Sequence, residues 1–452
     1  MQNYKQQFKG KKITIMGLGM LGRGLGYTKF LAECGADLIV TDLKTKEQLA
    51  TSIKALSKYS NPANGASIKF VLGEHRIQDF KNRDMIIKNP GVPMDSIYIK
   101  EARENNIQIE MDVSLFAKSA PEVMIIGVTG TRGKSMTTML IHEILTANKK
   151  FLRKEIYLGG NIRGVATLPL LKKVKAGDIV VCELDSWQLQ GFGEDKISPH
   201  ISVFTTFMRD HMNYYKDDMK KYFADKANIF KYQKKGDTLV IRKEMKKLIP
   251  KKLESKLIVA NEKVVKDWQF IVPGSHQRAN LACAVEVAKL FEIPEIKIKK
   301  VVKDFGGMEG RLEYMKNVKG VKIYNDNNAT TPEATIASLE ALKSGSPTSR
   351  NIILISGGND KNIDLKNFVN AINKYCKSVV LIPGTGTDKL VSSKLKVVSS
   401  KVDSLKEAVK DAIKESKRGD IILFSPAFSS FSQYNNEYER NDEFVKIIKK
   451  LK

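Results

Sequence analysis

The sequence predicts an α/β protein with largely parallel sheets, and three observations support this class. Short β-branched runs alternate with longer amphipathic stretches along the whole chain, which is the pattern of doubly wound domains. Two of these runs lead into glycine-rich turns, the kind of turn that can hold phosphate before a helix. The length of 452 residues suits two to four domains, and we find no repeat or heptad run.

Composition excludes several classes of protein. With 42% hydrophobic and 28% charged residues, the chain is not a mainly disordered protein. No apolar run approaches the roughly 20 residues needed to cross a bilayer, and residues 1–12 are polar, so we expect a cytoplasmic protein. The cysteines are too widely spaced for a metal or disulfide framework, and we expect reduced core thiols. They are Cys34, Cys182, Cys283 and Cys376.

The charge is unusually positive. There are 76 Lys and Arg residues against 50 Asp and Glu residues, which gives a formal net charge of +26. Such a balance attracts nucleic acid, anionic membrane surfaces or phosphorylated metabolites. It does not choose among these partners.

The first block of the chain has the order of a Rossmann-like domain. An apparent strand at Lys12–Met16 is followed by Gly-Leu-Gly-Met-Leu-Gly at 17–22 and by a helical stretch to about Cys34. A second strand, Leu38–Val40, precedes Asp42, which lies where such folds place an acidic residue. We predict a Rossmann-like domain over residues 1–113. The glycine pattern alone would equally begin an NAD-dependent dehydrogenase.

The second block contains a candidate phosphate loop. A strand at Val123–Val128 is followed by Thr-Gly-Thr-Arg-Gly-Lys-Ser at 129–135, and then by a helix from about Met136. Backbone N–H groups and the positive helix end would favour phosphate, Lys134 would bridge the terminal phosphates, and the Ser135 hydroxyl would ligate Mg²⁺. The alternative is a tight glycine turn with a surface lysine. We predict a central P-loop ATPase domain with a mostly parallel sheet over residues 114–307.

A buried strand in the same block ends in a carboxylate. The run Val-Val-Cys-Glu at 180–183 is apolar up to Glu183. Phosphoryl transfer requires Mg²⁺ held by the loop serine and a nearby acid, so Glu183 is a natural second ligand.

The third block begins after Gly306-Gly307 and predicts another Rossmann-like domain over residues 308–452. Its expected strands are Lys322–Tyr324, Asn351–Ile355, Ser378–Ile382 and Asp420–Phe424.

The phosphate loop departs from the ordinary P-loop, which would require glycine where the chain has Val128. Its spacing resembles the loop of the Mur ligase superfamily, and the order of further motifs extends the resemblance over nearly the whole chain. These motifs are residues 87–93 (IKNPGVP), 205–212 (TTFMRDHM), 222–230 (YFADKANIF), 274–280 (GSHQRAN), 310–314 (GRLEY), 324–330 (YNDNNAT), 357–361 (GGNDK) and 425–431 (SPAFSSF).

The resemblance implies a UDP-substrate domain, a central ATPase and a domain for the incoming amino acid. The implied activity is ATP-dependent ligation of glutamate to UDP-N-acetylmuramoyl-L-alanine through an acyl phosphate, in cytoplasmic peptidoglycan precursor synthesis. D-Glutamate is favoured over L-glutamate, although the pocket geometry that decides between them is not readable from sequence. We also expect two Mg²⁺ ions and a monomer that inserts into no membrane.

Site residues are carried over by the same resemblance. For the UDP-substrate they are Gly19, Met20, Leu21 and Gly22 at the pyrophosphate, Asp42 near the uracil, Asn89 and Gly91 at the sugar-phosphate, and Asn161 at the substrate carboxylate. For ATP they are Gly130, Thr131, Gly133, Lys134, Ser135, Asn280, Arg311 and Asp326. The catalytic group is Lys134, Glu183, His211 and Lys226, with Ser135, Glu183, His211 and a carbamylated Lys226 as Mg²⁺ ligands. For glutamate they are Thr330, Lys361, Ser430 and Phe431.

Three positions depart from the family pattern. Gln277 and Asn328 stand where the family has asparagine and lysine, and Arg132 replaces the commoner asparagine of the phosphate loop. One cationic contact is therefore missing, and Arg132 is a candidate to supply it. The ending NYExRG occurs only in an offset form at residues 436–441, so no aromatic contact is assigned there.

Other functions remain to be weighed. A poly-γ-glutamate or folylpolyglutamate ligase would share the central domain but lacks the first block, whereas an L-glutamate-adding relative stays open. A nucleic-acid-binding P-loop NTPase should show a concentrated basic stripe. The lysines are instead spread over stretches such as Lys243–Lys252 and Lys297–Lys303, which we interpret as solvated helix faces. An NAD-dependent dehydrogenase would leave the second and third blocks unexplained.

Overall fold

A computed structural model describes residues 4–20, 22–59, 67–342, 350–360, 363–430, 433–434 and 436–451. The chain divides into two compact units. The first unit contains residues 1–265 and 279–298, and the second contains residues 266–278 and 299–452.

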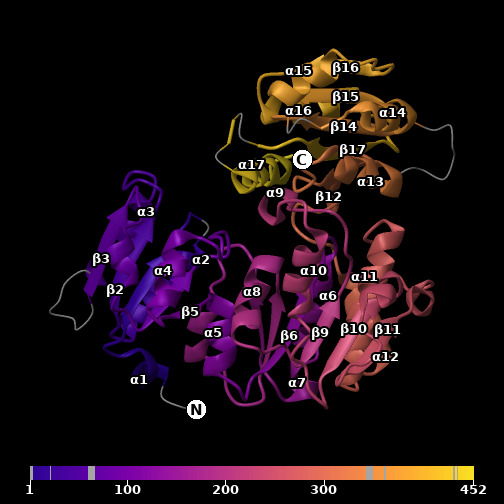
Figure 1. Ribbon diagram of the computed structural model, residues 1–452. Coiled ribbons are helices and arrows are strands. Elements are labelled where there is room, and N and C mark those ends of the chain that lie inside the picture. The colour runs from indigo at the N-terminus through magenta and orange to yellow at the C-terminus, as the bar shows by residue number, and fades with distance from the viewer. Residues whose placement is uncertain are drawn as a thin grey trace. The chain divides into compact units, whose positions relative to one another are not determined.

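The first unit begins with a parallel sheet of order β3-β2-β1-β4-β5. Its β1 has four consecutive buried residues after Lys12, as expected for a strand covered on both faces. The strands are β1 (Lys12–Met16), β2 (Asp37–Asp42), β3 (Ser67–Leu72), β4 (Met85–Lys88) and β5 (Gln108–Glu110). The helices are α1 (Tyr4–Phe8), α2 (Arg23–Glu33), α3 (Ala50–Leu56), α4 (Ile97–Glu104) and α5 (Asp112–Ser119), and Figure 1 labels them in indigo and purple.

The first unit continues with a second parallel sheet of order β11-β10-β9-β6-β8-β7. The central strands β6, β8 and β9 are almost wholly buried, so their carboxyl ends form a sheltered edge. The strands are β6 (Met124–Thr129), β7 (Ile156–Gly160), β8 (Ile179–Glu183), β9 (Ile201–Phe204), β10 (Thr238–Arg242) and β11 (Lys256–Ala260). The helices are α6 (Lys134–Ala147), α7 (Lys149–Leu152), α8 (Ser186–Glu194), α9 (Met212–Tyr215), α10 (Met219–Ala227), α11 (Ser275–Leu290) and α12 (Glu295–Asp304). Residues 275–278 of α11 and 299–304 of α12 belong to the second unit.

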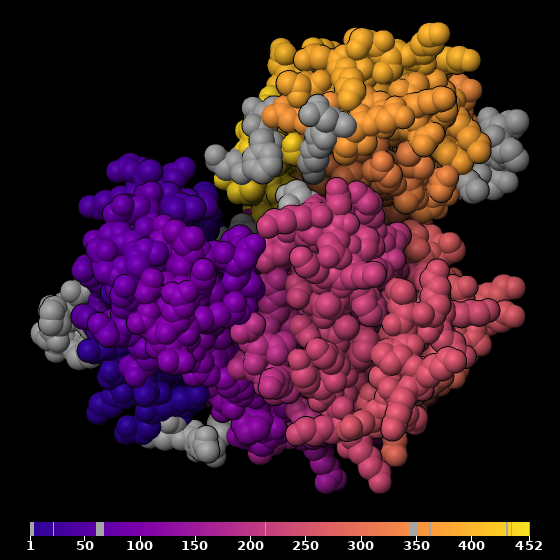
Figure 2. Space-filling view, viewed as in Figure 1, coloured from indigo at the N-terminus to yellow at the C-terminus, as the bar shows by residue number. Residues whose placement is uncertain are grey.

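The two sheets of the first unit are joined by buried polar contacts around α5. The Asp112 carboxylate, 4% exposed, accepts hydrogen bonds from the backbone N–H groups of Thr167 and Leu168, each at 2.8 Å. Nearby, Lys118 pairs with the buried Glu110 carboxylate at 2.5 Å and with Asp195 at 2.6 Å. Figure 2 shows the indigo-to-purple and magenta parts of this unit in direct contact.

The second unit contains a sheet of order β12-β13-β17-β14-β15-β16. Only β12 among its described strands runs antiparallel to its neighbour. The strands are β12 (Glu313–Val318), β13 (Val321–Asn325), β14 (Ile352–Gly357), β15 (Cys376–Ile382), β16 (Val398–Lys401) and β17 (Ile421–Ala427). The helices are α13 (Pro332–Leu342), α14 (Lys366–Tyr375), α15 (Thr385–Val391), α16 (Leu405–Glu415) and α17 (Glu437–Lys449).

The expected α/β class and mostly parallel sheets are confirmed, and every strand proposed from the sequence is present to within about three residues. The helix expected over Lys243–Lys252 is wrong. Lys243–Leu248 forms a 3₁₀ helix that ends before Pro250, because the residue preceding a proline is disfavoured in helical conformation. The lysine-rich stretch 297–303 does lie in α12.

The cysteines are free and buried in the core, as expected. Burial raises the pKa of every one of these thiols, to about 11 for Cys34 and about 12 for Cys283. They are therefore poor nucleophiles at neutral pH. Among the described residues, no helix has the length and apolar character to cross a membrane.

The buried Asp112 carboxylate gives a stability prediction. Asp112→Ala leaves two buried backbone N–H groups without acceptors, so the first unit should lose about 2–4 kcal/mol of unfolding free energy. Thermal denaturation compared with Glu122→Ala, an exposed acidic residue just beyond α5, measures the effect. Equal melting temperatures for the two variants would contradict a structural role for Asp112.

Candidate active site

The phosphate loop joins the end of β6 to the start of α6, as predicted. Gly130 and Gly133 both have positive φ, at 148° and 86°. A Cβ on Gly130 would collide with the Thr205 hydroxyl, and a Cβ on Gly133 would collide with the Asn280 side chain. Glycine is therefore required at both positions for conformation and for space. The structure also brings Asn280, predicted to contact ATP, against this loop.

The loop is fixed from behind by the segment after β9. The Thr131 N–H donates to the Thr206 carbonyl at 2.7 Å, and the Arg132 N–H donates to the Thr206 hydroxyl at 2.8 Å. Thr131 is 4% exposed, and its hydroxyl lies 3.3 Å from the Tyr222 hydroxyl. In this arrangement Thr131 anchors the loop, while the Arg132 guanidinium pairs with Asp210 at 2.9 Å.

Two lysines meet on one carbonyl of the loop. Lys134 Nζ and Lys226 Nζ each donate to the Gly130 carbonyl oxygen at 3.0 Å. Lys226 comes from α10 and is 2% exposed. Burial, together with the Lys134 charge, lowers the pKa of Lys226 to about 7. An appreciable fraction of this amine is thus neutral at physiological pH.

Glu183 supplies an unpaired carboxylate beside the loop. It is the last residue of β8, it is 5% exposed, and no described residue donates a hydrogen bond to its carboxylate. Ser135, 9% exposed, lies in the first turn of α6. This helix follows β6, the strand that pairs with β8. A buried carboxylate and a hydroxyl at the ends of adjacent strands are ligands that suit Mg²⁺.

The described side chains alone do not complete a metal site. No cluster of three or more His, Cys, Asp or Glu side chains with metal-binding geometry occurs in the described part of the chain. Mg²⁺ in nucleotide enzymes commonly takes one or two protein ligands and fills the remainder with phosphate oxygens and water. Glu183 and Ser135 fit that mode of binding.

His211 lies against aromatic rings close to the same loop. Its ring centroid is 4.8 Å from that of Trp187 and 6.2 Å from that of Tyr222. Burial lowers the pKa of His211. The Asp210 charge raises this pKa, and the charges of Lys226 and Lys134 lower it. The lowered pKa favours the neutral imidazole, which is the form that binds metal.

The first glycine turn is held by Asp42. The Asp42 carboxylate is 5% exposed and accepts from the N–H groups of Gly19 and Lys44, each at 2.9 Å. Asn89 packs under the turn, because a Cβ on Gly17 would lie 2.8 Å from Asn89 Cβ. Asp42 and Asn89 therefore shape the turn itself. Gly91 and Met20 are exposed, and Gly22 precedes α2 with a φ of 84°.

Asn161 follows β7 and is tied to Glu183. Its backbone N–H donates to the Glu183 carbonyl oxygen at 2.7 Å. Its side-chain Oδ1 accepts from the Arg23 guanidinium at 2.7 Å. The residue predicted to bind the substrate carboxylate thus lies beside the predicted metal ligand.

In the second unit, Arg311 projects from a tightly held turn. The side chain is exposed and makes no hydrogen bond or ion pair with any described residue. The Asp326 carboxylate accepts from the Leu312 N–H at 3.0 Å and from Ser338 and Ser425 at 2.6 and 2.8 Å. Burial raises the pKa of Asp326 to about 6. Asp326 therefore holds the Arg311 turn as a structural acceptor.

Asn328, which stands in place of lysine, also supports that turn. Its N–H donates to the Gly310 carbonyl at 2.9 Å and its Nδ2 donates to the Glu309 carbonyl at 3.3 Å. Asn441 Nδ2 donates to the Glu309 carboxylate at 2.6 Å. Asn328 therefore lacks the positive charge of the lysine found in the family, and it donates hydrogen bonds to two backbone carbonyls of the turn.

The remaining glutamate-binding predictions divide into two groups. Thr330 is half-buried after β13, and Ser430 is 3% exposed after β17. Lys361 and Phe431 lie outside the described residues, as does Leu21 of the UDP-substrate set.

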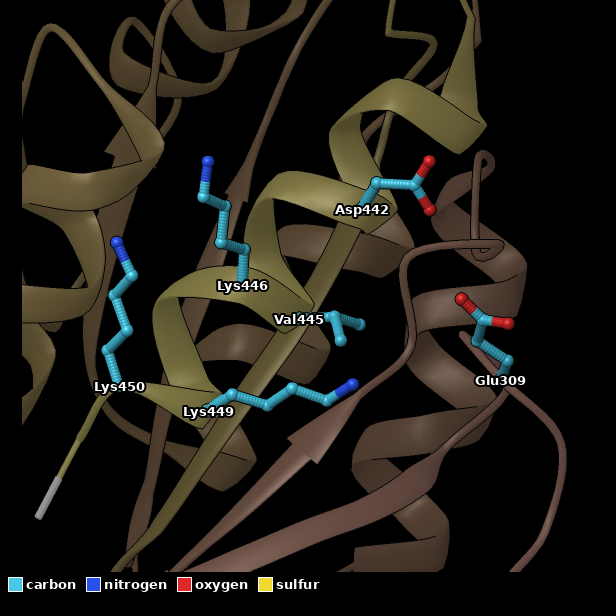
Figure 3. A pocket seen from close by; sticks show the side chains of 6 residues that line it. All are labelled: Glu309, Asp442, Val445, Lys446, Lys449 and Lys450. Carbon is cyan, nitrogen blue, oxygen red and sulfur yellow. The ribbon is translucent and has the colours of Figure 1, made fainter.

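A shallow pocket of about 480 Å³ lies along α17 in the second unit, as Figure 3 shows. None of the predicted site residues lines it. Its lysines are exposed and extend outward from the helix, so we assign no function to it. The lining residues are Glu309, Asp442, Val445, Lys446, Lys449 and Lys450.

Sequence reasoning assigned no role to two buried cations, one in each unit. Lys88 is 1% exposed and donates to the Val92 carbonyl at 2.9 Å, inside the 87–93 motif. Arg440, also 1% exposed, donates to Asn327 Oδ1 at 2.8 Å. The sequence contained a signal for the burial of Lys88, because this lysine directly follows the apolar run 85–87. A parallel strand that is covered on both faces has no side exposed to solvent. Arg440 lies in the offset ending at residues 436–441, to which no contact was assigned.

Comparison with known proteins matches each part of the chain. The family described as "Mur ligase MurD-like, N-terminal domain" matches residues 11–110. The "Mur ligase middle domain" family matches residues 128–277, and the "Mur ligase, glutamate ligase domain" family matches residues 310–428. A UDP-N-acetylmuramoylalanine–D-glutamate ligase of Borreliella afzelii (strain PKo) is 35% identical, over 98% of this chain and 99% of that protein. The chain belongs to the Mur ligase family.

Other Mur ligases agree with this assignment. A UDP-N-acetylmuramoylalanine–D-glutamate ligase of Roseiflexus sp. (strain RS-1) is 33% identical, over 98% of this chain and 99% of its own. Among solved structures, the UDP-N-acetylmuramate-alanine ligase MurC of Thermotoga maritima has a TM-score of 0.61 at 20% identity, covering 98% of this chain and 100% of its own. MurF ligase of the same organism, solved with ADP, has a TM-score of 0.57 at 17% identity, over 92% and 95%. These two structures share the fold.

The collision at Gly133 gives a prediction for this Mur ligase. Gly133→Ala should weaken ATP binding at least tenfold, because the new Cβ forces apart the phosphate loop and Asn280. Gly236→Ala is the matched control, since Gly236 also has positive φ but has open space around it. Calorimetric titration with ATP should leave the control close to wild type. Equal weakening in both variants would show that backbone strain alone, and not the Asn280 contact, is responsible.

Proposed function

We propose that this Mur ligase joins D-glutamate to UDP-N-acetylmuramoyl-L-alanine with conversion of ATP to ADP and phosphate, as a cytoplasmic monomer in peptidoglycan precursor synthesis. The observation that carries the proposal is the arrangement around Gly130, where Lys134, Lys226 and the loop glycines surround one turn beside the unpaired Glu183 carboxylate. The relatives named D-glutamate ligases supply the substrate and its enantiomer.

The proposed division of labour follows the three expected domains. Residues 1–113 would bind the UDP moiety on the glycine turn, residues 114–307 would bind ATP, and residues 308–452 would bring glutamate through Thr330, Lys361, Ser430 and Phe431. Gly22 would offer its backbone N–H near the start of α2, where the helix dipole favours a pyrophosphate. Gly19, whose N–H donates to Asp42, would shape the turn against the same group.

In the first chemical step, the alanyl carboxylate attacks the γ-phosphorus of ATP, and the bond between that phosphorus and the ADP oxygen breaks. Lys134 leaves the Gly130 carbonyl to neutralise charge on the transferring phosphoryl group. Asn161 orients the attacking carboxylate. The product is an acyl phosphate and ADP.

In the second step, the glutamate amine attacks the acyl carbon and forms a tetrahedral intermediate. The carbon–oxygen bond to phosphate then breaks, and the amide nitrogen loses its proton to give the product. Water must be kept from the acyl phosphate during this step. Thr330 and Ser430 would hold the amino acid so that its amine lies close enough to compete with hydrolysis.

Ser135, Glu183, His211 and carbamylated Lys226 would hold two Mg²⁺ ions. Bound Mg²⁺ would neutralise negative charge on the phosphates. Carbamylation joins the neutral Lys226 amine to carbon dioxide with loss of a proton, and it replaces a cation by an anion. Burial and the Lys134 charge favour the neutral amine that this reaction requires.

The first test is a product assay with both glutamate enantiomers. Purified protein with UDP-N-acetylmuramoyl-L-alanine, ATP and Mg²⁺ should form an amide with D-glutamate, followed by product mass and ADP release. L-Glutamate should give at most a trace. Product from L-glutamate alone would overturn the enantiomer, and no product from either would overturn the substrate assignment.

Glu183→Gln tests the proposed metal ligand. Removing this carboxylate's charge while keeping its shape should lower kcat by at least a hundredfold. Glu122→Gln, at an exposed position, is the matched control. Near-normal turnover of Glu183→Gln at low Mg²⁺ would remove Glu183 from the site.

NMR spectroscopy of protein trapped with isotope-labelled bicarbonate tests the carbamylation of Lys226. Wild-type protein should give one carbamate resonance that is absent in Lys226→Met. Lys118→Met, which removes a partly buried lysine held by two carboxylates, should keep the resonance. A resonance that survives Lys226→Met would place the carbamate on another amine.

A further inference from the structure

The contact between Arg23 and Asn161 joins the two sheets of the first unit at the proposed substrate site. Arg23 is the first residue of α2 and directly follows the glycine turn. Its guanidinium donates to Asn161 Oδ1 at 2.7 Å, although the two residues are 138 positions apart in the chain. Both side chains are half-buried. The contact therefore links the segment proposed to bind pyrophosphate with the residue proposed to bind the reactive carboxylate.

The backbones on both sides of this contact are closely packed. A Cβ on Gly26 of α2 would lie 2.7 Å from the Ala166 Cβ, and a Cβ on Gly22 would lie 3.5 Å from the Gly164 Cα. The small residues of α2 thus let the loop after β7 approach the helix directly. Such close approach restricts sliding of the helix along the loop.

The loop carrying Asn161 is held at both ends. Asn161 N–H is bonded to the Glu183 carbonyl, and Gly160 N–H donates to the Thr167 hydroxyl at 2.9 Å. Asp112 accepts from the next two N–H groups, of Thr167 and Leu168. With the backbone fixed, the main remaining freedom of Asn161 is the rotation of its side-chain amide.

Hydrogen-bond chemistry determines how that amide must face. Arginine carries only donors, so Arg23 can pair with the amide oxygen of Asn161 and never with its NH₂ group. The Nδ2 group makes no hydrogen bond to any described residue, and it is therefore the group left for a ligand. A carboxylate only accepts hydrogen bonds, so it requires Nδ2 and would be repelled by Oδ1.

We propose that Arg23 is a positioning residue that fixes the Asn161 amide with Nδ2 directed to the alanyl carboxylate of the UDP-substrate. This inference rests on the proposed function. Without Arg23, the amide can turn over and present its oxygen to the carboxylate, which misorients the attacking group.

A double-mutant cycle tests the inference. Arg23→Met keeps the apolar stem and removes the donors, and Asn161→Ala removes the amide. Each single variant should lower kcat of amide formation about tenfold to a hundredfold, with KM for ATP and glutamate within about twofold of wild type. The double variant should be no slower than Asn161→Ala alone, because Arg23 acts through Asn161.

Further variants separate positioning from general damage. Arg23→Lys retains a donor and should recover part of the lost kcat. Lys29→Met, which removes one positive charge from an exposed position on the same helix, should match wild type. Melting temperatures identify any variant that is merely unfolded, and the cycle can then be repeated with Arg23→Gln, which keeps a side-chain donor group.

The outcomes distinguish this inference from the proposed function. If the wild-type protein forms no amide with either enantiomer, the proposed function fails. If wild type is active but Arg23→Met has normal kcat, Arg23 does not position the nucleophile. If the single-variant effects multiply in the double variant, Arg23 acts independently of Asn161 and the inference is wrong.

Discussion

The carbonyl oxygen of Gly130 accepts hydrogen bonds from Lys134 and Lys226, and the proposed active site depends on this shared acceptor. Two ammonium groups on one buried oxygen repel each other, and burial adds to the penalty on Lys226. The arrangement therefore favours release of a proton from Lys226 or departure of Lys134 toward an anion. Both changes suit a site that binds phosphate and carries out phosphoryl transfer.

The strand order explains why these groups meet. Strand β6 lies between β8 and β9, so the phosphate loop, Glu183 and the Thr205–Thr206 segment all follow adjacent strands at one sheet edge. Binding at the carboxyl ends of parallel strands is a general property of doubly wound sheets. The local sequence places each residue at a strand end, and the parallel register brings the ends together.

The sequence predicts residues with self-contained local signals better than residues whose role depends on distant contacts. The loop glycines and Glu183 follow apolar runs, and the structure places them at strand ends as expected. The ligand contacts of Asp42 and Asp326 stay predictions, and the sequence did not predict that their buried carboxylates accept backbone N–H groups. Their partners come from other segments, Gly19 and Leu312, so no local pattern could reveal those contacts. The Arg23–Asn161 contact escaped prediction for the same reason.

The central claim is that the substrate carboxylate, and no water molecule, attacks the γ-phosphorus of ATP at the Gly130 loop. The most direct measurement uses UDP-N-acetylmuramoyl-L-alanine whose alanyl carboxylate carries a heavy oxygen isotope, with mass analysis of the inorganic phosphate released during ligation. The account predicts that one labelled oxygen passes from the carboxylate to phosphate for each amide formed. Amide formation that yields only unlabelled phosphate would contradict it.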